Sequence, residues 1–240
     1  AFMPVGTKGA VRAVTQRDLD DLEAQIILAN TYHLFLRPGD RLIARQGGLH
    51  RFMGWEKPIL TDSGGYQVFS LAPMGTVSED GVQFRSHIDG SSHLLTPESA
   101  AEIQARLGSD IAMVLDECPP HTASREFVLA SMQRTGRWAR RARNRFLELK
   151  SGIVGGEEFV NPEQAQFGIV QGGVYTELRE QSVHEIVDVG FESYAIGGLS
   201  VGEPVDLMYQ IVSATTSSLP ECSARYLMGT GMPEDLVECV

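Results

Sequence analysis

Short apolar runs alternate with amphipathic helical patterns along this chain, at intervals of roughly 30 residues. This alternation limits the fold more than any other feature, because parallel strands cannot be joined by tight turns and need a crossover, usually a helix. The repeated strand-to-helix order therefore predicts an α/β fold on a parallel sheet. Seven runs are typical of strands: residues 2–5, 26–29, 58–60, 111–115, 167–170, 194–196 and 225–228.

Helix start and stop signals lie between these runs. The clearest helix is predicted over residues 96–108, where Thr96 suits the N-cap, Pro97 the first turn and Gly108 the stop. Further helices are predicted over residues 124–149 and 176–190, and after Pro38, Pro204 and Pro233.

Seven strand-and-helix units predict a (β/α)8 TIM barrel that lacks its eighth strand. An open doubly wound sheet is the alternative, but no Gly-x-Gly-x-x-Gly motif follows the first run. We expect one incomplete barrel domain over residues 1–240, with a β-hairpin inserted near residues 79–96 around Asp89-Gly90. Because the last helical pattern reaches Val240, we also expect a truncated sequence.

Composition narrows the class of protein. No apolar run approaches the roughly 20 residues of a membrane span, and the N-terminus lacks a signal-peptide pattern. We therefore expect no membrane partner and a cytoplasmic location. Cys118, Cys222 and Cys239 cannot all pair and lack close metal-ligand spacing, so the sequence predicts reduced thiols and no metal ligands in this chain.

The formal net charge of −11 is distributed unevenly. Residues 1–150 carry a net charge of +1, whereas residues 151–240 hold only Arg179 and Arg225 against 14 acidic residues. Arginines at helical spacing within residues 134–145 form a basic face that could meet phosphates. A solvated helix with paired charges is the alternative for that face.

Polar residues follow five of the predicted strands. Active sites of barrels lie at the carboxyl ends of the strands, so these residues predict a common pocket. The five endings are Asn30-Thr31-Tyr32-His33, Asp62, Asp116-Glu117-Cys118, Gln171-Gly172-Gly173 and Gly197-Gly198-Leu199.

The residue types at these ends suit a purine. A carboxylate at Asp116 can accept from the N–H and amino groups of a guanine-like edge, while the Gln171 amide or a backbone N–H donates to its carbonyl. Glycine backbone at residues 197–198 allows a flat ligand to come close. Tyr66 and Met228, after their own strands, are candidates for stacking on the two faces of the ring.

Five motifs together resemble the tRNA-guanine transglycosylase family, over essentially the whole chain. They are Thr61-Asp62-Ser63-Gly64-Gly65-Tyr66-Gln67, Leu115-Asp116-Glu117-Cys118, Val170-Gln171-Gly172-Gly173, Ile196-Gly197-Gly198-Leu199-Ser200-Val201-Gly202-Glu203 and Tyr226-Leu227-Met228-Gly229. The resemblance implies exchange of the wobble guanine in U-G-U anticodons for a deazaguanine base, through a covalent ribosyl-enzyme intermediate, in queuosine biosynthesis. The implied partners are tRNA, bound at its anticodon loop, guanine and aminomethyl-deazaguanine.

The resemblance also assigns roles to residues. Asp62 matches the general acid/base, and the remaining matches are substrate-binding positions. Asn30 and Gln67 match the neighbouring nucleotide pocket. Cys118 and Val201 match the bacterial form of the base pocket, which favours the aminomethyl precursor over queuine. The substrate-binding positions are Asn30, Ser63, Tyr66, Gln67, Asp116, Cys118, Gln171, Gly198, Leu199, Val201, Glu203 and Met228.

The sequence also departs from the family pattern. The nucleophilic aspartate is expected beyond Val240, followed by a Cys-Cys-Cys-His zinc subdomain, and a short N-terminal segment is expected before Ala1. Met232 stands where a lysine is common, which puts one phosphate contact in doubt. We expect the 240 residues alone to be inactive, and the full-length protein to hold structural zinc and form a homodimer.

Three alternatives remain. A non-catalytic tRNA-binding or purine-binding accessory subunit is one, although both Asp62 and Asp116 are present. An archaeal-type transglycosylase, which acts elsewhere in tRNA, is another. A hydrolase with Ser63 as nucleophile is the third, but Ser63 lacks the Gly-x-Ser-x-Gly elbow and a histidine assigned as its base.

Overall fold

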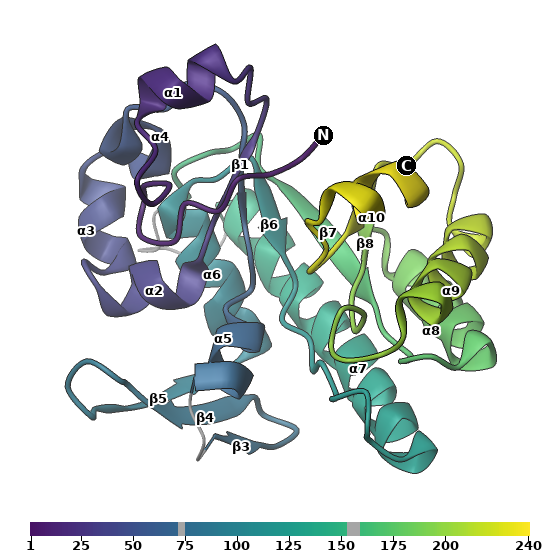
Figure 1. Cartoon of the computed structure of the whole chain (residues 1–240). Coiled ribbons are helices and arrows are strands. Elements are labelled where there is room, and N and C mark those ends of the chain that lie inside the picture. Colours follow the sequence, from purple (N-terminus) through teal and green to yellow (C-terminus); the bar gives the residue numbers. More distant parts are fainter. Residues whose placement is uncertain (72–74, 153–158) are drawn as a thin grey trace. The chain divides into compact units, whose positions relative to one another are not determined.

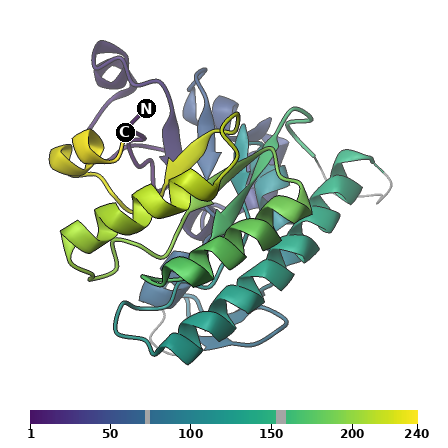
Figure 2. The same ribbon diagram turned by 90° about the vertical axis from the view of Figure 1, so that its right-hand side faces the viewer.

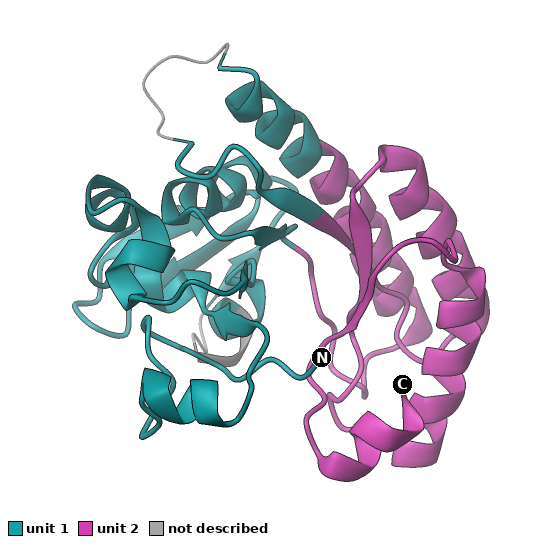
Figure 3. Ribbon diagram, turned by 90° about the horizontal axis from the view of Figure 1, so that it is seen from above, with its two compact units in different colours: residues 1–115, 141–166 teal, residues 116–140, 167–240 magenta. Residues whose placement is uncertain are grey.

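The computed structural model describes residues 1–71, 75–152 and 159–240 (Figure 1) and contains two compact units (Figure 3). Unit 1 comprises residues 1–115 and 141–166, and unit 2 comprises residues 116–140 and 167–240. Helix α7 (Arg125–Lys150) and strand β7 (Ala165–Val170) each contribute residues to both units. Continuous regular elements therefore lead from one unit into the other.

Unit 1 is built on parallel strands. β1 (Ile27–Ala29) pairs with β2 (Ile59–Thr61), and β2 pairs with β6 (Ile111–Met113). All residues of β1 and β2 are buried, as in parallel strands covered on both faces. The helices of this unit, besides part of α7, are α1 (Gln16–Asp21), α2 (Thr31–Leu36), α3 (Asp40–Arg45), α4 (Gly48–Met53), α5 (Gly65–Leu71) and α6 (Pro97–Leu107).

The strand predicted over residues 2–5 is wrong. Only Val5 forms an isolated parallel bridge, to Leu28. Pro4 has no N–H to donate to a ladder, and the side chains of Phe2 and Val5 are about half exposed, at 51% and 49%. The segment therefore gains too little burial and too few hydrogen bonds to extend the strand.

Strand β6 is shorter than the predicted run of residues 111–115, and a helix side chain explains where it ends. The Gln104 amide, fully buried in α6, takes both backbone groups of Met113: its Nε2 donates to the Met113 carbonyl and its Oε1 accepts from the Met113 N–H, each at 2.8 Å. Gln104 Oε1 also accepts from the Thr61 hydroxyl at 3.0 Å. One side chain thus satisfies both backbone groups of the last residue of β6 and bonds to the last residue of β2.

A small antiparallel sheet lies in the sequence between β2 and β6. β4 (Val82–Arg85) pairs with β5 (Ser92–Leu95), and β3 (Thr76–Val77) pairs with β4. The buried Phe84 ring lies 5.4 Å from the rings of both Tyr32 and His93. The contact with Tyr32 attaches the sheet to α2.

Unit 2 repeats the strand-and-helix plan. β7 pairs in parallel with β8 (Ser193–Ile196), and β8 with β9 (Arg225–Leu227). Figure 2 shows α8 (Thr176–Val189) and α9 (Val205–Ser218) side by side, covering one face of these strands. α10 (Pro233–Glu238) follows β9. The parallel pairing in both units confirms the predicted α/β class.

The basic face of α7 carries acidic partners. Arg141 forms a bidentate ion pair with Glu98 at 2.7–2.8 Å, and Arg145 pairs with Glu102 at 2.7 Å, both within unit 1. In unit 2, Arg134 pairs with the buried Glu117. These pairs favour the interpretation of α7 as a helix with paired charges over a phosphate-binding face.

Candidate active site

Asp62 emerges directly from the end of β2 and is surrounded by hydrogen-bond donors. Its carboxylate accepts from the Thr31 N–H at 2.8 Å, from the Gly64 N–H at 3.1 Å and from the Asn30 amide. The Gln67 side chain donates as well. Asn30, Asp62 and Gln67 therefore form one polar cluster.

The local chain path explains this shell. Helix α2 begins at Thr31, immediately after β1, and its N-cap residue Asn30 makes no capping bond, so its amide is available to Asp62. Gly64 has φ +82°, and a Cβ there would lie 3.2 Å from the Tyr32 backbone nitrogen, so a side chain would be strained and tightly packed.

Burial raises the pKa of the Asp62 carboxyl, while the hydrogen bonds from Asn30, Thr31, Gln67 and Gly64 oppose the shift. The net effect is a pKa above the ordinary value of 3.8. A carboxyl group with a raised pKa is suited to holding and releasing a proton during a reaction.

Two other predicted residues lie on the segment after Asp62. Tyr66 is exposed in α5, so its ring is accessible to a ligand. Ser63 is buried, and its hydroxyl accepts from the Gly65 N–H at 3.2 Å. No histidine in the described part of the chain lies within hydrogen-bond distance of that hydroxyl, which counts against Ser63 as a hydrolase nucleophile.

The predicted base-recognition residues gather in unit 2. The Gln171 amide, 1% exposed, donates to the Asp116 carboxylate at 2.6 Å, while its Oε1 is buried without a hydrogen-bond partner among the described residues. Both residues follow strands in the chain, Asp116 after β6 and Gln171 after β7. The pair offers acceptor and amide groups that a polar ligand edge could complete.

Glycines at 197 and 198 bring backbone against this pair. A Cβ at Gly197 would lie 2.7 Å from Ile169 Cγ2, and one at Gly198 would lie 2.2 Å from Gln171 Oε1. Gly198 also has φ +67°, so a side chain there would be both strained and blocked. The turn after β8 therefore requires glycine to approach Gln171.

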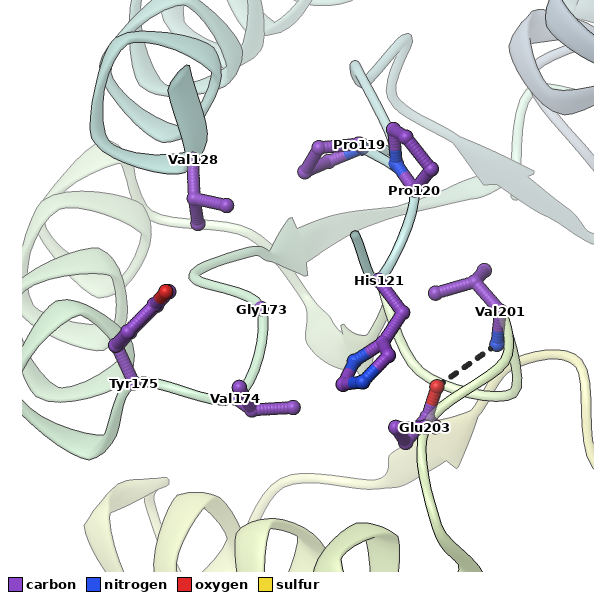
Figure 4. Close-up of a pocket in the computed structure, with 10 residues that line it drawn as sticks. Pro119, Pro120, His121, Val128, Gly173, Val174, Tyr175, Val201 and Glu203 are labelled. Atoms are coloured by element: carbon purple, nitrogen blue, oxygen red, sulfur yellow. Dashed lines mark hydrogen bonds between the residues drawn. The ribbon is translucent and has the colours of Figure 1, made fainter. Parts of the chain in front are cut away.

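A small pocket adjoins Gly198 within unit 2 (Figure 4). The side chains of His121 and Glu203 lie near each other beside it, and the Glu203 carboxylate accepts from the N–H groups of Ser200 and Val201. Its lining residues are Pro119, Pro120, His121, Val128, Gly173, Val174, Tyr175, Gly198, Val201 and Glu203.

Three further predicted residues surround the same turn of unit 2. Leu199 is buried and follows Gly198 directly. Met228 is partly buried, and its N–H donates to the Ile196 carbonyl at 3.1 Å, which continues the pairing of β9 with β8. Cys118 is partly buried.

The Cys118 thiol is expected to be unreactive in the folded protein. Burial and the neighbouring Asp116 charge raise its pKa to about 12, so almost no thiolate forms near pH 8. Iodoacetamide at pH 8 should modify the exposed Cys222 and leave Cys118 unlabelled, as read by peptide mass spectrometry. Labelling of both in urea is the control, and equal labelling of the two in the native protein would contradict the prediction.

Sequence reasoning missed two residues that hold the site. Arg179 is fully buried in α8 and donates to backbone carbonyls around the Gly198 turn, and Gln104 holds the end of β2. A sequence signal for Arg179 exists, since it is one of two basic residues in the acidic stretch 151–240. Gln104 has no such signal, because a glutamine within a helix is usually exposed.

The described residues offer neither a metal site nor a membrane span. Across residues 1–71, 75–152 and 159–240, no three or more His, Cys, Asp or Glu side chains are grouped so that they could hold a metal ion. The zinc prediction concerns residues outside this chain and stays a prediction. Among the described helices, none combines the length and apolarity needed to cross a bilayer.

Comparisons with known proteins agree with the resemblance. The family model for queuine tRNA-ribosyltransferase matches residues 1–240. Proteins named queuine tRNA-ribosyltransferase from Pelotomaculum thermopropionicum and Halothermothrix orenii are 55% and 53% identical over 239 residues, covering 100% of this chain and 61% of each relative. One from Solidesulfovibrio magneticus is 54% identical over 236 residues, covering 98% of this chain and 60% of the relative.

The chain therefore spans about 60% of the length of the curated relatives it matches. The family match, by contrast, extends over every residue of the chain. With this coverage and identities above 50% to several relatives, the chain belongs to the queuine tRNA-ribosyltransferase family.

Proposed function

We propose that the protein is a tRNA-guanine transglycosylase, a pentosyltransferase that exchanges the wobble guanine of U-G-U anticodons for the aminomethyl-deazaguanine precursor of queuine. The observation that carries this proposal is the buried Asp116–Gln171 pair, with its unpartnered amide oxygen, next to a turn whose glycines let the backbone approach Gln171 closely. Membership of the family supports it.

Asp62 is the proposed proton carrier. A carboxylate attacks the ribose C1′ and the guanine leaves, taking a proton from Asp62. The incoming base then returns a proton to Asp62 as it displaces the enzyme, which restores the original configuration, as in retaining glycosidases. The raised pKa of Asp62 supports this role, since the group can hold the proton between the two half-reactions. The attacking aspartate is expected beyond Val240.

Asp116, Gln171 and Gly198 are the proposed groups for guanine recognition. The Asp116 carboxylate accepts from the N1–H and 2-amino group, while donors meet the 6-oxygen. Tyr66 and Met228 are proposed to stack on the ring, Ser63 to line the base site, and Asn30 and Gln67 to serve the neighbouring nucleotide. Guanine must leave its stack to be exchanged, which a single-stranded anticodon loop makes inexpensive.

The aminomethyl group is proposed to interact with the Leu199 carbonyl. Because Glu203 accepts from the Ser200 N–H, the trans peptide turns the Leu199 carbonyl the opposite way, leaving it free to accept from an ammonium. Val201 and Cys118 match the bacterial form of the pocket. Preference for queuine over its aminomethyl precursor, in incorporation into unmodified tRNA, would contradict this choice of substrate.

Several broader features belong to the same proposal. The parallel strands of the two units are proposed to belong to a (β/α)8 barrel domain with the antiparallel sheet as an insertion. The whole protein is proposed to bind tRNA at the anticodon loop, to hold structural zinc, to form a homodimer and to act in the cytoplasm. The family match over the whole chain supports these expectations.

The direct test is exchange of labelled guanine into tRNA by the whole protein that carries this chain. Label should enter a tRNA with a U-G-U anticodon and not the same tRNA with adenine at the wobble position. Binding of that tRNA without exchange would favour the accessory-subunit alternative, and exchange at a different position would favour the archaeal type. The 240-residue chain alone should show no exchange.

A further inference from the structure

Arg179 is a buried cation whose hydrogen bonds all go to backbone carbonyls. It lies in the first turn of α8 and is 1% exposed. Within the described residues, no acidic side chain lies within ion-pair distance of its guanidinium. Its acceptors are the carbonyls of Gly173 at 2.8 Å, Val170 at 3.1 Å, Gly197 at 2.7 Å and Gly198 at 3.4 Å.

The charge persists at neutral pH. Burial lowers the pKa of Arg179 to about 10, while the neighbouring Cys118 and Glu203 oppose the shift, so the guanidinium is protonated at pH 7. A buried charge is costly unless its hydrogen bonds are satisfied, and here backbone carbonyls satisfy it. Burying a cation beside the turn that follows β8 is therefore costly in free energy for the folded protein.

The bond to Gly197 sets the direction of the next amide. In a trans peptide the carbonyl and the following N–H point in opposite directions, so a Gly197 carbonyl that faces Arg179 turns the Gly198 N–H away from it. That N–H donates to the Cys118 sulfur, which lies near the Asp116 charge. Sulfur is a weak acceptor, so an oxygen atom of a ligand would be a better partner.

We propose that Arg179 is a positioning residue for base selection: it holds the Gly197 carbonyl so that the Gly198 N–H faces the 6-oxygen of a bound guanine-type base. This inference rests on the proposed function. The guanidinium also polarises the 197–198 peptide, which strengthens its N–H as a donor. Arg179 therefore favours bases with a carbonyl oxygen at position 6 without touching them.

The test compares guanine with 6-thioguanine, which keeps the N1–H and 2-amino donors but offers sulfur, a poorer acceptor, at position 6. Dissociation constants are measured by calorimetry for the whole protein and for Arg179→Met and Arg179→Lys. We expect Arg179→Met to weaken the binding of guanine about 10- to 100-fold and the binding of 6-thioguanine much less. The preference for guanine then largely disappears. The preference of Arg179→Lys for guanine over 6-thioguanine should lie between that of the wild type and that of Arg179→Met.

Arg225→Met is the matched control. Arg225 also donates to backbone carbonyls in unit 2, those of Leu219 and Pro220, each at 3.3 Å. It should change neither dissociation constant. An isotope-edited infrared measurement adds a second readout, because the 6-carbonyl stretch of guanine should shift to lower frequency on binding and shift less in Arg179→Lys.

The outcomes separate this inference from the proposed function. Failure of the wild-type protein to bind guanine contradicts the proposed function. Equal weakening of both bases in Arg179→Met shows a role in stability alone and overturns the inference. If Arg179→Met does not fold, Arg179→Lys decides: a reduced preference for guanine together with a smaller shift of the carbonyl frequency supports the inference, and a wild-type value of either one overturns it.

Discussion

Replacing Asp62 with asparagine is expected to lower kcat for guanine exchange about 10²- to 10⁴-fold, the usual contribution of a positioned general acid or base. The variant keeps the shape of the side chain but cannot carry the proton. Rates of labelled-guanine exchange in the whole protein, at saturating tRNA, measure the loss.

The hydrogen-bond shell predicts that this variant folds. The new amide oxygen can accept from the Thr31 and Gly64 N–H groups, and its nitrogen can face Asn30 if the Asn30 amide turns over and presents its oxygen. Asp18→Asn, at an exposed N-terminal cap in the same unit, is the control for the chemical change. A fully active Asp62→Asn protein would refute the assignment of Asp62.

The pH dependence of stability gives an independent check. Because the folded pKa of Asp62 is raised above its ordinary value, folding is favoured at low pH, and this contribution is lost as pH rises through the folded pKa. The asparagine variant has no such loss. Its free energy of unfolding relative to wild type should therefore increase as pH rises above about 4.

Asp116→Asn is expected to weaken guanine binding by about 10²- to 10³-fold, because a hydrogen bond to a charged group contributes about 1.5–3 kcal/mol and guanine presents two donors to this carboxylate. An asparagine offers one acceptor and one donor, and its donor opposes a donor of guanine. Xanthine has an acceptor in place of the 2-amino group, so its affinity for Asp116→Asn should increase relative to that of guanine.

Calorimetric titration with both bases measures this change in selectivity. Asp206→Asn, at an exposed position in the first turn of α9, removes the same charge elsewhere in unit 2 and should leave both affinities unchanged. The assignment fails if the Asp116 variant binds guanine and xanthine in the wild-type ratio.

The sequence predicted the elements with strong local signals. Helix α6 begins after Thr96 and ends at Gly108 with φ +68°, as its capping pattern indicates. The Asp116–Gln171 contact also follows from the strand-end pattern. The strand prediction over residues 2–5 was wrong because it rested on apolar character alone. It did not consider that Pro4 lacks an N–H for the ladder or that the side chains of Phe2 and Val5 stay half exposed.

Contacts between distant segments were beyond the sequence pattern. No local sequence signal indicates that arginines of α7 form ion pairs with Glu98, Glu102 and Glu117. From the sequence alone, the basic face of this helix therefore looked free to bind phosphates. Arg179 and Gln104 bond to backbone groups, which every residue has. The amino-acid sequence therefore does not indicate which residues are their partners. Such roles become visible only once the chain path is known.

The amide of Gln104 has an architectural consequence. Peptide groups at the end of a strand need hydrogen-bond partners, and here one helix residue bonds both backbone groups of Met113 at the end of β6 and the hydroxyl of Thr61 at the end of β2. The backbone groups of Met113, next to the last paired residues of β2 and β6, are thus satisfied by a helix side chain. Both strand ends therefore depend on a residue of α6, so a substitution in that helix can disturb the segment before Asp62 without changing any strand residue.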